Sequence, residues 1–167
     1  KHSMKSIDED VKAGRFQPVY LLYGEETYLK RQYKQKLQQA VADVDDTMNT
    51  AYYEGKNINP GEIIDLAETL PFFADRRLIL LENTGMFKTS CEELAEYIKH
   101  MAETTCLVFV EEEVDKRGKM YKAVKNNGRV VEFARQTDAL LTKWILSRLK
   151  REGKKITQSD MQLLLEK

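Results

Sequence analysis

The sequence has little cysteine and histidine, and each shortage excludes a class of site. It contains two cysteines and two histidines in 167 residues. Cys91 and Cys106 do not form a CxxC pair, so a disulfide framework or a zinc site lacks ligands, and we expect both thiols to be buried or half-buried and inert. With His2 ahead of Met4, only His100 is left for a Ser-His-Asp catalyst, and it falls in a predicted helix. We therefore predict neither a metal site nor catalytic residues.

The sequence also lacks a charge excess and any long apolar run. Lys and Arg number 27, as do Asp and Glu, and this balance disfavours a stand-alone nucleic-acid binder, whose affinity rests largely on positive charge. No run approaches the roughly 18 apolar residues of a membrane helix, and no signal-like stretch follows Lys5. We expect a cytoplasmic protein without a membrane partner. Residues 1–3 are interpreted as a cloning remnant ahead of the native start at Met4.

Five short apolar runs alternate with amphipathic segments. The predicted strands span residues 18–23, 48–53, 77–81, 106–110 and 130–133. The predicted helices between and before them span residues 6–13, 25–41, 59–70, 90–101 and 116–126. Continuous apolar strands that alternate with helices are typical of a parallel sheet covered on both faces, so the predicted class is α/β.

The pattern changes after Phe133, where strands give way to helices. One helix is predicted from about Asp138 to Gly153, and another starts at Thr157 and is still in progress at Lys167. Their apolar positions need partners that this sequence does not supply. The chain is therefore expected to be a piece of a longer protein that ends within a helical second domain, with residues 4–134 as the first domain and 135–167 as the start of the second.

The junction of the first strand and its helix is where a phosphate-binding loop, G-x-x-x-x-G-K-[ST], is expected. The stretch there reads Gly24, Glu25, Glu26, Thr27, Tyr28, Leu29, Lys30 and Arg31. The first glycine and the lysine fit. Leu29 replaces the second glycine, Arg31 cannot ligate magnesium, and Glu25 and Glu26 repel polyphosphate. We therefore predict a plain strand-to-helix turn that binds no nucleotide and a chain without cofactors, with a cryptic ATPase as the alternative.

Acidic residues follow two other predicted strands. Glu82 comes after one strand, and Glu111, Glu112 and Glu113 come at the end of the next. Such carboxylates can help to hold Mg²⁺ on a nucleotide, but without a phosphate cradle the more favoured interpretation is a solvated acidic loop.

Two adjacent phenylalanines stand in the loop between the helix at 59–70 and the strand at 77–81. The loop reads Leu70, Pro71, Phe72, Phe73, Ala74 and Asp75. Neighbouring residues in an irregular segment seldom face the same way, so burying both rings at once is difficult. Two interpretations stay open here, ordinary capping of the core and an exposed apolar tip of the kind that anchors partner interfaces.

Three stretches resemble the family of bacterial DNA polymerase III delta subunits. The first runs from Pro18 to Leu29, and the second from Leu70 to Arg77. The third and most specific stretch includes Asp115, Lys116, Arg117, Lys119, Tyr121 and Lys122 and is followed by Val131-Glu132-Phe133. The resemblance covers residues 4–167, and the family's proteins are about twice this length.

The resemblance implies a non-catalytic subunit of the clamp loader that serves DNA replication. Its first domain would be AAA+-type without a working nucleotide site, followed by a small helical lid, with the collar domain that joins the other loader subunits absent. Such a subunit binds the beta sliding clamp and opens the ring for loading onto primed DNA. The family's clamp-binding pair falls on Phe72 and Phe73, with Leu70 and Pro71 beside it. Primed DNA would be a partner only within the complex.

Two other function classes remain open from the residues alone. An unrecognised P-loop-like NTPase would use Lys30 and the acidic strand ends. A weak nucleic-acid-binding module would use two clusters of basic residues, at 116–125 and at 143–155. A solvated helical face is the favoured interpretation of those clusters because the net charge is zero.

Overall fold

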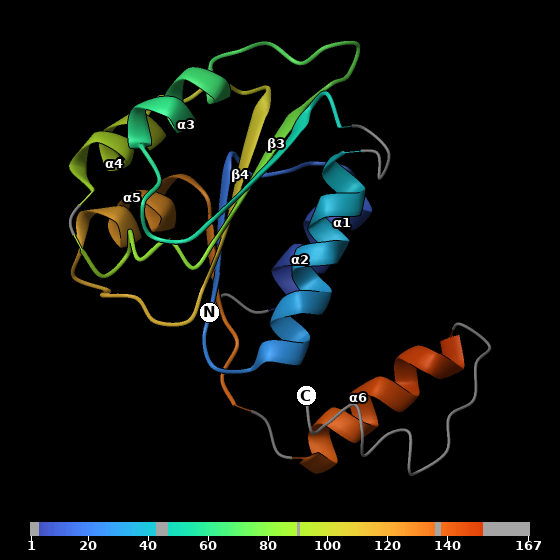
Figure 1. The fold of residues 1–167 in the computed structure, drawn as a ribbon. Coiled ribbons are helices and arrows are strands. Elements are labelled where there is room, and N and C mark those ends of the chain that lie inside the picture. The colour runs from blue at the N-terminus through green and yellow to red at the C-terminus, as the bar shows by residue number, and fades with distance from the viewer. Residues whose placement is uncertain (1–3, 43–46, 90, 136–137, 152–167) are drawn as a thin grey trace. The chain divides into compact units, whose positions relative to one another are not determined.

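The computed structural model describes residues 4–42, 47–89, 91–135 and 138–151 of the chain (Figure 1). The chain divides into two compact units, Lys1–Phe133 and Ala134–Lys167. Some predictions lie outside the described residues: the remnant at 1–3, the predicted helix start at residue 90, the helix end at Gly153 and the helix that starts at Thr157.

The first unit is built on a five-stranded parallel sheet, as the sequence predicted. Its strands stand in the order β2-β3-β4-β1-β5, and each neighbouring pair is parallel. The strands are β1 (Val19–Tyr23), β2 (Thr50–Glu54), β3 (Arg77–Glu82), β4 (Thr105–Glu111) and β5 (Arg129–Glu132). The predicted α/β class and parallel sheet are confirmed.

The central strands are apolar along most of their length, and helices cover both of their faces. Every residue of β1 and β4 is buried, and Leu21 of β1 lies in register between Phe109 of β4 and Val130 of β5. At one edge of the sheet, β2 is half-exposed. Continuous burial on both faces distinguishes such strands from those of a sheet with one face in solvent, in which buried and exposed residues alternate.

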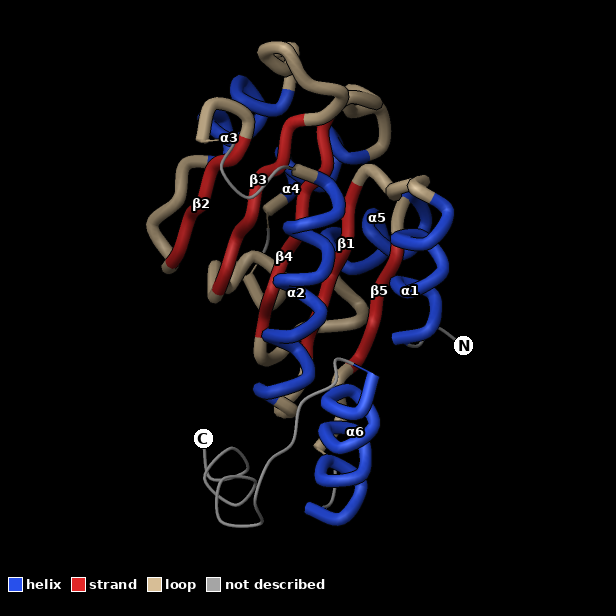
Figure 2. Tube along the Cα trace, turned by 90° about the vertical axis from the view of Figure 1, so that its right-hand side faces the viewer, coloured by secondary structure: helices blue, strands red, loops and turns tan. Residues whose placement is uncertain are grey.

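Five helices cover the sheet. In Figures 1 and 2, α1 (Met4–Ala13) and α2 (Thr27–Val41) lie on one face, and the other three lie on the opposite face. Those three are α3 (Pro60–Ala67), α4 (Glu92–Ile98) and α5 (Lys119–Asn127). The predicted start of α3 is confirmed in detail, because the Asn59 side chain accepts a hydrogen bond from the Gly61 amide at 2.9 Å and Pro60 is the first helical residue.

Four helix starts differ from those predicted. The first helix begins at Met4, two residues before the predicted start at residue 6, and the second begins at Thr27, two residues after the predicted start at residue 25. Cys91 occupies the cap position of α4 without a side-chain hydrogen bond. The fifth helix begins at Lys119 and not at Lys116, because residues 115–118 form a turn in which the Gly118 amide donates to the Asp115 carbonyl at 3.0 Å.

A buried ion pair fastens α1 to the sheet. Asp10 is 6% exposed, and its carboxylate accepts from Arg129 Nε at 2.6 Å and Nη2 at 2.8 Å and from the Tyr20 hydroxyl at 2.8 Å. These contacts join the first helix to β1 and β5. A buried carboxylate is tolerated because it is paired and hydrogen-bonded.

The second unit is described through α6 (Asp138–Arg151). Within this helix the Arg148 guanidinium lies 5.7 Å from the centre of the Trp144 ring, one helical turn away. No helix within the described residues has the length and apolar character needed to cross a membrane.

Candidate functional site

The predicted phosphate loop lies at the carboxyl end of the sheet and is closed by its own side chains. Glu26 is the cap of α2, and its carboxylate accepts hydrogen bonds from the amides of Tyr28 at 3.0 Å and Leu29 at 3.3 Å. A helix N-terminus binds anions through such free amides. Here a carboxylate of the chain itself occupies the place where a phosphate oxygen would bind.

The lysine of the loop is turned toward carbonyl oxygens of the chain. Lys30 is 9% exposed, and its ammonium group donates to the carbonyls of Gly24 at 2.7 Å and Glu111 at 3.0 Å. Burial lowers the pKa of Lys30, while nearby carboxylates, Glu112 foremost, act in the opposite direction. The lysine therefore joins the ends of two strands and does not extend to where a polyphosphate would lie.

The remaining loop residues fit the same closed arrangement. Gly24 adopts a φ of 125°, and a Cβ placed on it would come within 2.3 Å of the Phe133 carbonyl oxygen. That oxygen also accepts from the Glu26 amide at 3.0 Å. Leu29 is buried in the core, whereas Glu25 and Arg31 are exposed. The glycine, the helix cap and the lysine of this loop are therefore all engaged by groups of the chain, and the lack of nucleotide binding stays a prediction.

The acidic residues at the strand ends are held apart by separate partners. Glu82 pairs with Lys34 at 2.8 Å, and Glu113 pairs with Lys88 at 2.8 Å. Glu111 is buried and accepts from the Thr84 hydroxyl at 2.7 Å and from two nearby amides. Within the described parts of the chain, no three His, Cys, Asp or Glu side chains group closely enough to hold a metal ion.

Burial, opposed by those hydrogen bonds, raises the pKa of Glu111. This carboxylate joins the end of β4 to the loop after β3, since Thr84 and Gly85 follow that strand. Its contacts assign it a structural role.

At the opposite, amino end of the sheet, the segment between α3 and β3 carries an exposed apolar tip. We use this name for Leu70, Pro71, Phe72 and Phe73. Leu70 is 74% exposed, Phe72 55% and Phe73 93%, while Pro71 is half-buried. The two rings pack edge to face with centroids 4.4 Å apart. Of the two interpretations left open by the sequence, the exposed tip matches the structure and capping of the core does not.

The backbone of the tip is unusual at its most exposed residue. Phe73 has a φ of +52°, in the left-handed region that a residue with a Cβ rarely adopts. The Phe73 ring is 93% exposed and packs on the ring of its exposed neighbour Phe72, so no contact with the core favours this backbone. Such outliers concentrate at functional positions, where surrounding contacts impose them.

Two buried polar residues that we did not identify from the sequence form hydrogen bonds with the main chain of the tip and of Thr69 beside it. Asn49 is 1% exposed; its side-chain amide donates to the Phe72 carbonyl at 2.8 Å, and its oxygen accepts from the Phe72 amide at 2.6 Å. Arg77 is 6% exposed, and its guanidinium donates to the carbonyls of Thr69 at 3.0 Å and Leu70 at 3.1 Å. The only sequence signal was an arginine at the start of an apolar strand.

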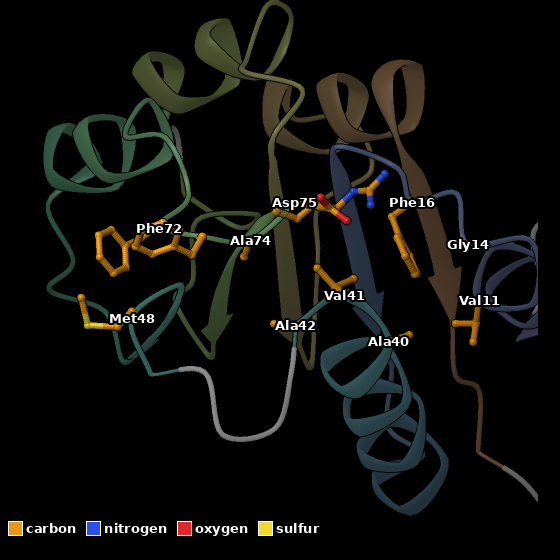
Figure 3. Close-up of a pocket in the computed structure, with 12 residues that line it drawn as sticks. Val11, Gly14, Phe16, Ala40, Val41, Ala42, Met48, Phe72, Ala74 and Asp75 are labelled. Atoms are coloured by element: carbon orange, nitrogen blue, oxygen red, sulfur yellow. The ribbon is translucent and has the colours of Figure 1, made fainter.

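A groove of about 850 Å³ continues from the tip across the amino end of the sheet. Figure 3 shows Phe72 and Met48 at one end of it and Phe16 and Val11 at the other, with Val41 from the end of α2 between them. The guanidinium of Arg76 also lines it and lies 5.1 Å from the centre of the Phe16 ring. The tip is therefore part of a larger face, which includes this groove of mixed polar and apolar surface.

The motif between β4 and α5 lies at the carboxyl end, away from the tip. Asp115 accepts from the Arg117 amide at 2.9 Å and from its guanidinium at 3.1 Å. The Lys116 ammonium lies 5.9 Å from the centre of the Tyr23 ring, and the Tyr121 ring packs edge to face on the same ring at 6.3 Å. These contacts fasten the turn before α5 to the end of β1.

The two basic residues of that motif on α5 lie at the surface. Lys119 forms an exposed pair with Glu92 at 3.2 Å, and Lys122 lines a shallow depression between α4 and α5. Because Glu92 and Glu96 line the same depression, its charge is mixed, which matches the favoured interpretation of a solvated face.

Comparison with known proteins gives a consistent result. The family model described as DNA polymerase III, delta subunit, matches residues 20–134. The chain is 31% identical over 170 residues to DNA polymerase III subunit delta of Bacillus subtilis (strain 168), covering 94% of this chain and 49% of that protein. It thus spans about half the length of this relative.

Two solved structures have a similar fold. The Bacillus subtilis DNA clamp loader delta protein (YqeN) superposes with a TM-score of 0.76 at 26% identity, covering 95% of this chain and 50% of that one. A DNA polymerase III gamma subunit-related protein from Thermotoga maritima superposes with a TM-score of 0.56 at 12% identity, covering 85% of this chain and 48% of that one. The second match concerns the fold alone.

Proposed function

Because the chain belongs to the family of DNA polymerase III delta subunits, we propose that it binds the beta sliding clamp through the apolar tip and opens the ring for loading onto primed DNA. The observation that carries this proposal is the pair of exposed rings at Phe72 and Phe73, held at the amino end of the sheet. Aromatic side chains that enter a pocket on a partner commonly contribute most of the binding energy of an interface.

The proposed role requires binding that differs between two states of the clamp. A subunit opens a ring only if it binds the open form better than the closed form. The tip supplies affinity, and the neighbouring groove, with its mixed polar and apolar surface, offers additional contact area on the same face that can distinguish the open from the closed geometry. In this proposal the binding energy offsets the cost of the broken ring interface.

The same proposal gives the chain no catalytic residue. The closed phosphate loop, with Glu26 on the helix amides and Lys30 on two carbonyls, argues against an NTPase. ATP would act on other loader subunits. We further propose that residues 4–134 are an AAA+-like domain and that residues 135–167 begin a helical lid domain. Contact with the other loader subunits would be made through the collar domain, and primed DNA would be a partner only within the complex.

The experiment that tests the proposal is binding of this chain to the beta sliding clamp of Bacillus subtilis. Replacing Phe72 and Phe73 together by alanine should weaken binding by roughly 2 kcal/mol or more while leaving the fold intact. Tyr52→Ala is the matched control, because Tyr52 is 54% exposed, as Phe72 is at 55%, but belongs to β2 and not to the tip. Equal affinity of wild type and double alanine variant would overturn the assignment of the tip.

The alternatives predict different outcomes in the same samples. An NTPase would show magnesium-dependent binding of ATP by calorimetry. A nucleic-acid module would bind primed DNA with a strong dependence on salt, through the basic residues of α5 and α6. The proposal expects clamp binding that needs no ATP, no heat from ATP, and no binding of DNA by this chain alone at physiological salt.

A further inference from the structure

We infer that Asn49 and Arg77 are positioning residues for the apolar tip, holding its main chain in one conformation so that Phe73 is displayed before any partner arrives. The expected effect of these residues on clamp binding rests on the proposed function. Their effect on the conformation of the tip rests only on the hydrogen bonds described below. Neither residue belongs to the tip, and both are buried within the amino end of the sheet.

The contact of Asn49 with Phe72 copies a main-chain pairing. The Asn49 side chain donates to the Phe72 carbonyl and accepts from the Phe72 amide, so one primary amide satisfies both polar groups of that residue. Among side chains only Asn and Gln provide a donor and an acceptor in this planar arrangement. The Asn49 main chain is itself fixed, because its carbonyl accepts from the Leu78 amide at 2.8 Å.

Arg77 fixes the other side of the tip. Its guanidinium donates to the carbonyls of Thr69 and Leu70, and a longer contact of 3.4 Å reaches the Met48 carbonyl. The Arg77 main chain is held too, since its amide donates to the Thr104 carbonyl at 2.7 Å. One side chain thus connects the segment before β2 with the segment after α3.

Together these bonds leave a short free apex. Hydrogen bonds hold the main chain at Thr69, Leu70 and Phe72 on one side and at Arg77 on the other. Residues 73–76 form the short stretch between these held positions. This accounts for the left-handed backbone of Phe73, which its own side chain does not favour. A loop ordered in advance binds more tightly, because less conformational entropy is lost on binding.

The first test is local order without any partner. In Asn49→Ala, exchange of the Phe72 amide hydrogen, followed by NMR, should become at least tenfold faster, while core amides such as that of Val108 keep their wild-type protection. Asn57→Ala is the matched control, because Asn57 is exposed in the loop after β2. Unchanged exchange at Phe72, or equal acceleration at Phe72 and Val108, would overturn the inference, since the second result is general destabilisation.

A second variant guards against failure of Asn49→Ala to fold. Arg77→Lys keeps the positive charge but replaces the planar fork by a single ammonium, which cannot span the same carbonyls. Accelerated exchange of the tip amides in this variant supports the inference. Wild-type exchange there would overturn the role of Arg77.

The last test measures binding to the beta sliding clamp of Bacillus subtilis in a double-mutant cycle. Asn49→Ala should weaken binding by roughly five- to thirtyfold, the factor expected when one residue must be ordered on binding. In a Phe73→Ala background the same change should have little effect, because Asn49 acts through that ring. Additive losses, or no loss from Asn49→Ala while Phe73→Ala weakens binding, would overturn positioning. If Phe73→Ala and the variant with both Phe72 and Phe73 replaced by alanine bind the clamp like wild type, the proposed function fails. The amide exchange measurements alone then decide the positioning role.

Discussion

The ammonium group of Lys30 lies 2.7 Å from the carbonyl oxygen of Gly24, six residues earlier in the chain. In a working phosphate loop the glycine and the lysine both face the phosphates. Here they are bound to each other, and the lysine also holds the Glu111 carbonyl of the neighbouring strand. The same two residue types that suggest a nucleotide site in the sequence are therefore used to fasten the carboxyl end of the sheet.

We predict that Lys30→Met destabilises the fold by about 2 kcal/mol, because two buried carbonyls lose their donor. Arg31→Met is the matched control: Arg31 is the exposed neighbour on the same helix, and a change there should stay within about 0.5 kcal/mol. Urea unfolding of the two variants measures the difference. Equal stabilities would contradict a structural role for Lys30.

Gly24 provides a second prediction at the same loop. A side chain at Gly24 meets both a left-handed backbone, φ +125°, and the Phe133 carbonyl at 2.3 Å, so we expect Gly24→Ala to cost more than about 3 kcal/mol. Gly14→Ala is the control, because Gly14 has a φ of +68° with open space around it and should cost only about 1 kcal/mol. Thermal unfolding of both variants separates the effect of the clash from that of the backbone preference. Similar losses of stability in the two variants would contradict the close approach of Gly24 to the Phe133 carbonyl.

The sheet could be predicted from sequence because its signals are local. The apolar run from Leu78 to Leu81 lies inside one strand, and Asn59 caps the helix that it precedes. Helix starts were wrong for equally local reasons. Met4 and Lys5 extend α1 ahead of its predicted start, and the turn stabilised by Asp115 delays the start of α5.

The exposure of the tip could not be decided from sequence because it depends on distant residues. Phe72 is fixed by Asn49, 23 positions earlier, and only the folded sheet brings the two together. Asn49 lies inside the strand predicted at residues 48–53, and nothing in the pattern there distinguishes it from its neighbours. The two phenylalanines of the tip stood out in the sequence, but only the resemblance to a family assigned them to clamp binding, and that role stays a prediction.

The strained backbone at Phe73 predicts a conflict between stability and binding. Asn tolerates the left-handed region better than Phe, so Phe73→Asn should leave the fold as stable as the wild type or up to about 1 kcal/mol more stable, while it weakens clamp binding. Phe72→Asn is the control, because Phe72 has no positive φ to relieve and should gain no stability. Urea unfolding and clamp titration of the same samples test this. A loss of stability in Phe73→Asn would mean that the ring stabilises the fold.

The two thiols should differ in reactivity, and the pH dependence follows from burial. Cys106 is fully buried within β4, and burial raises the pKa of its thiol from 9.0 to about 12; Cys91 is half-buried, and burial raises the pKa of its thiol as well. Because the thiolate is the species that reacts, Cys106 in a Cys91→Ser variant should resist iodoacetamide at pH 8 and react fully only in denaturant. Rapid labelling of Cys106 in the folded chain would contradict this.

The same pKa fixes the sign of a stability change at high pH. Between pH 9 and about 12 the folded chain keeps the Cys106 proton that the unfolded chain releases, so the folded state binds more protons and stability falls as the pH rises through this range. Cys106→Ala removes the titrating group and should unfold with a shallower loss of stability above pH 9 than the wild type. Cys91→Ser is the control, because it leaves Cys106 in place and should keep most of the wild-type slope. Parallel slopes for wild type and Cys106→Ala would assign the alkaline loss of stability to other groups, such as the tyrosines whose pKa values burial also raises.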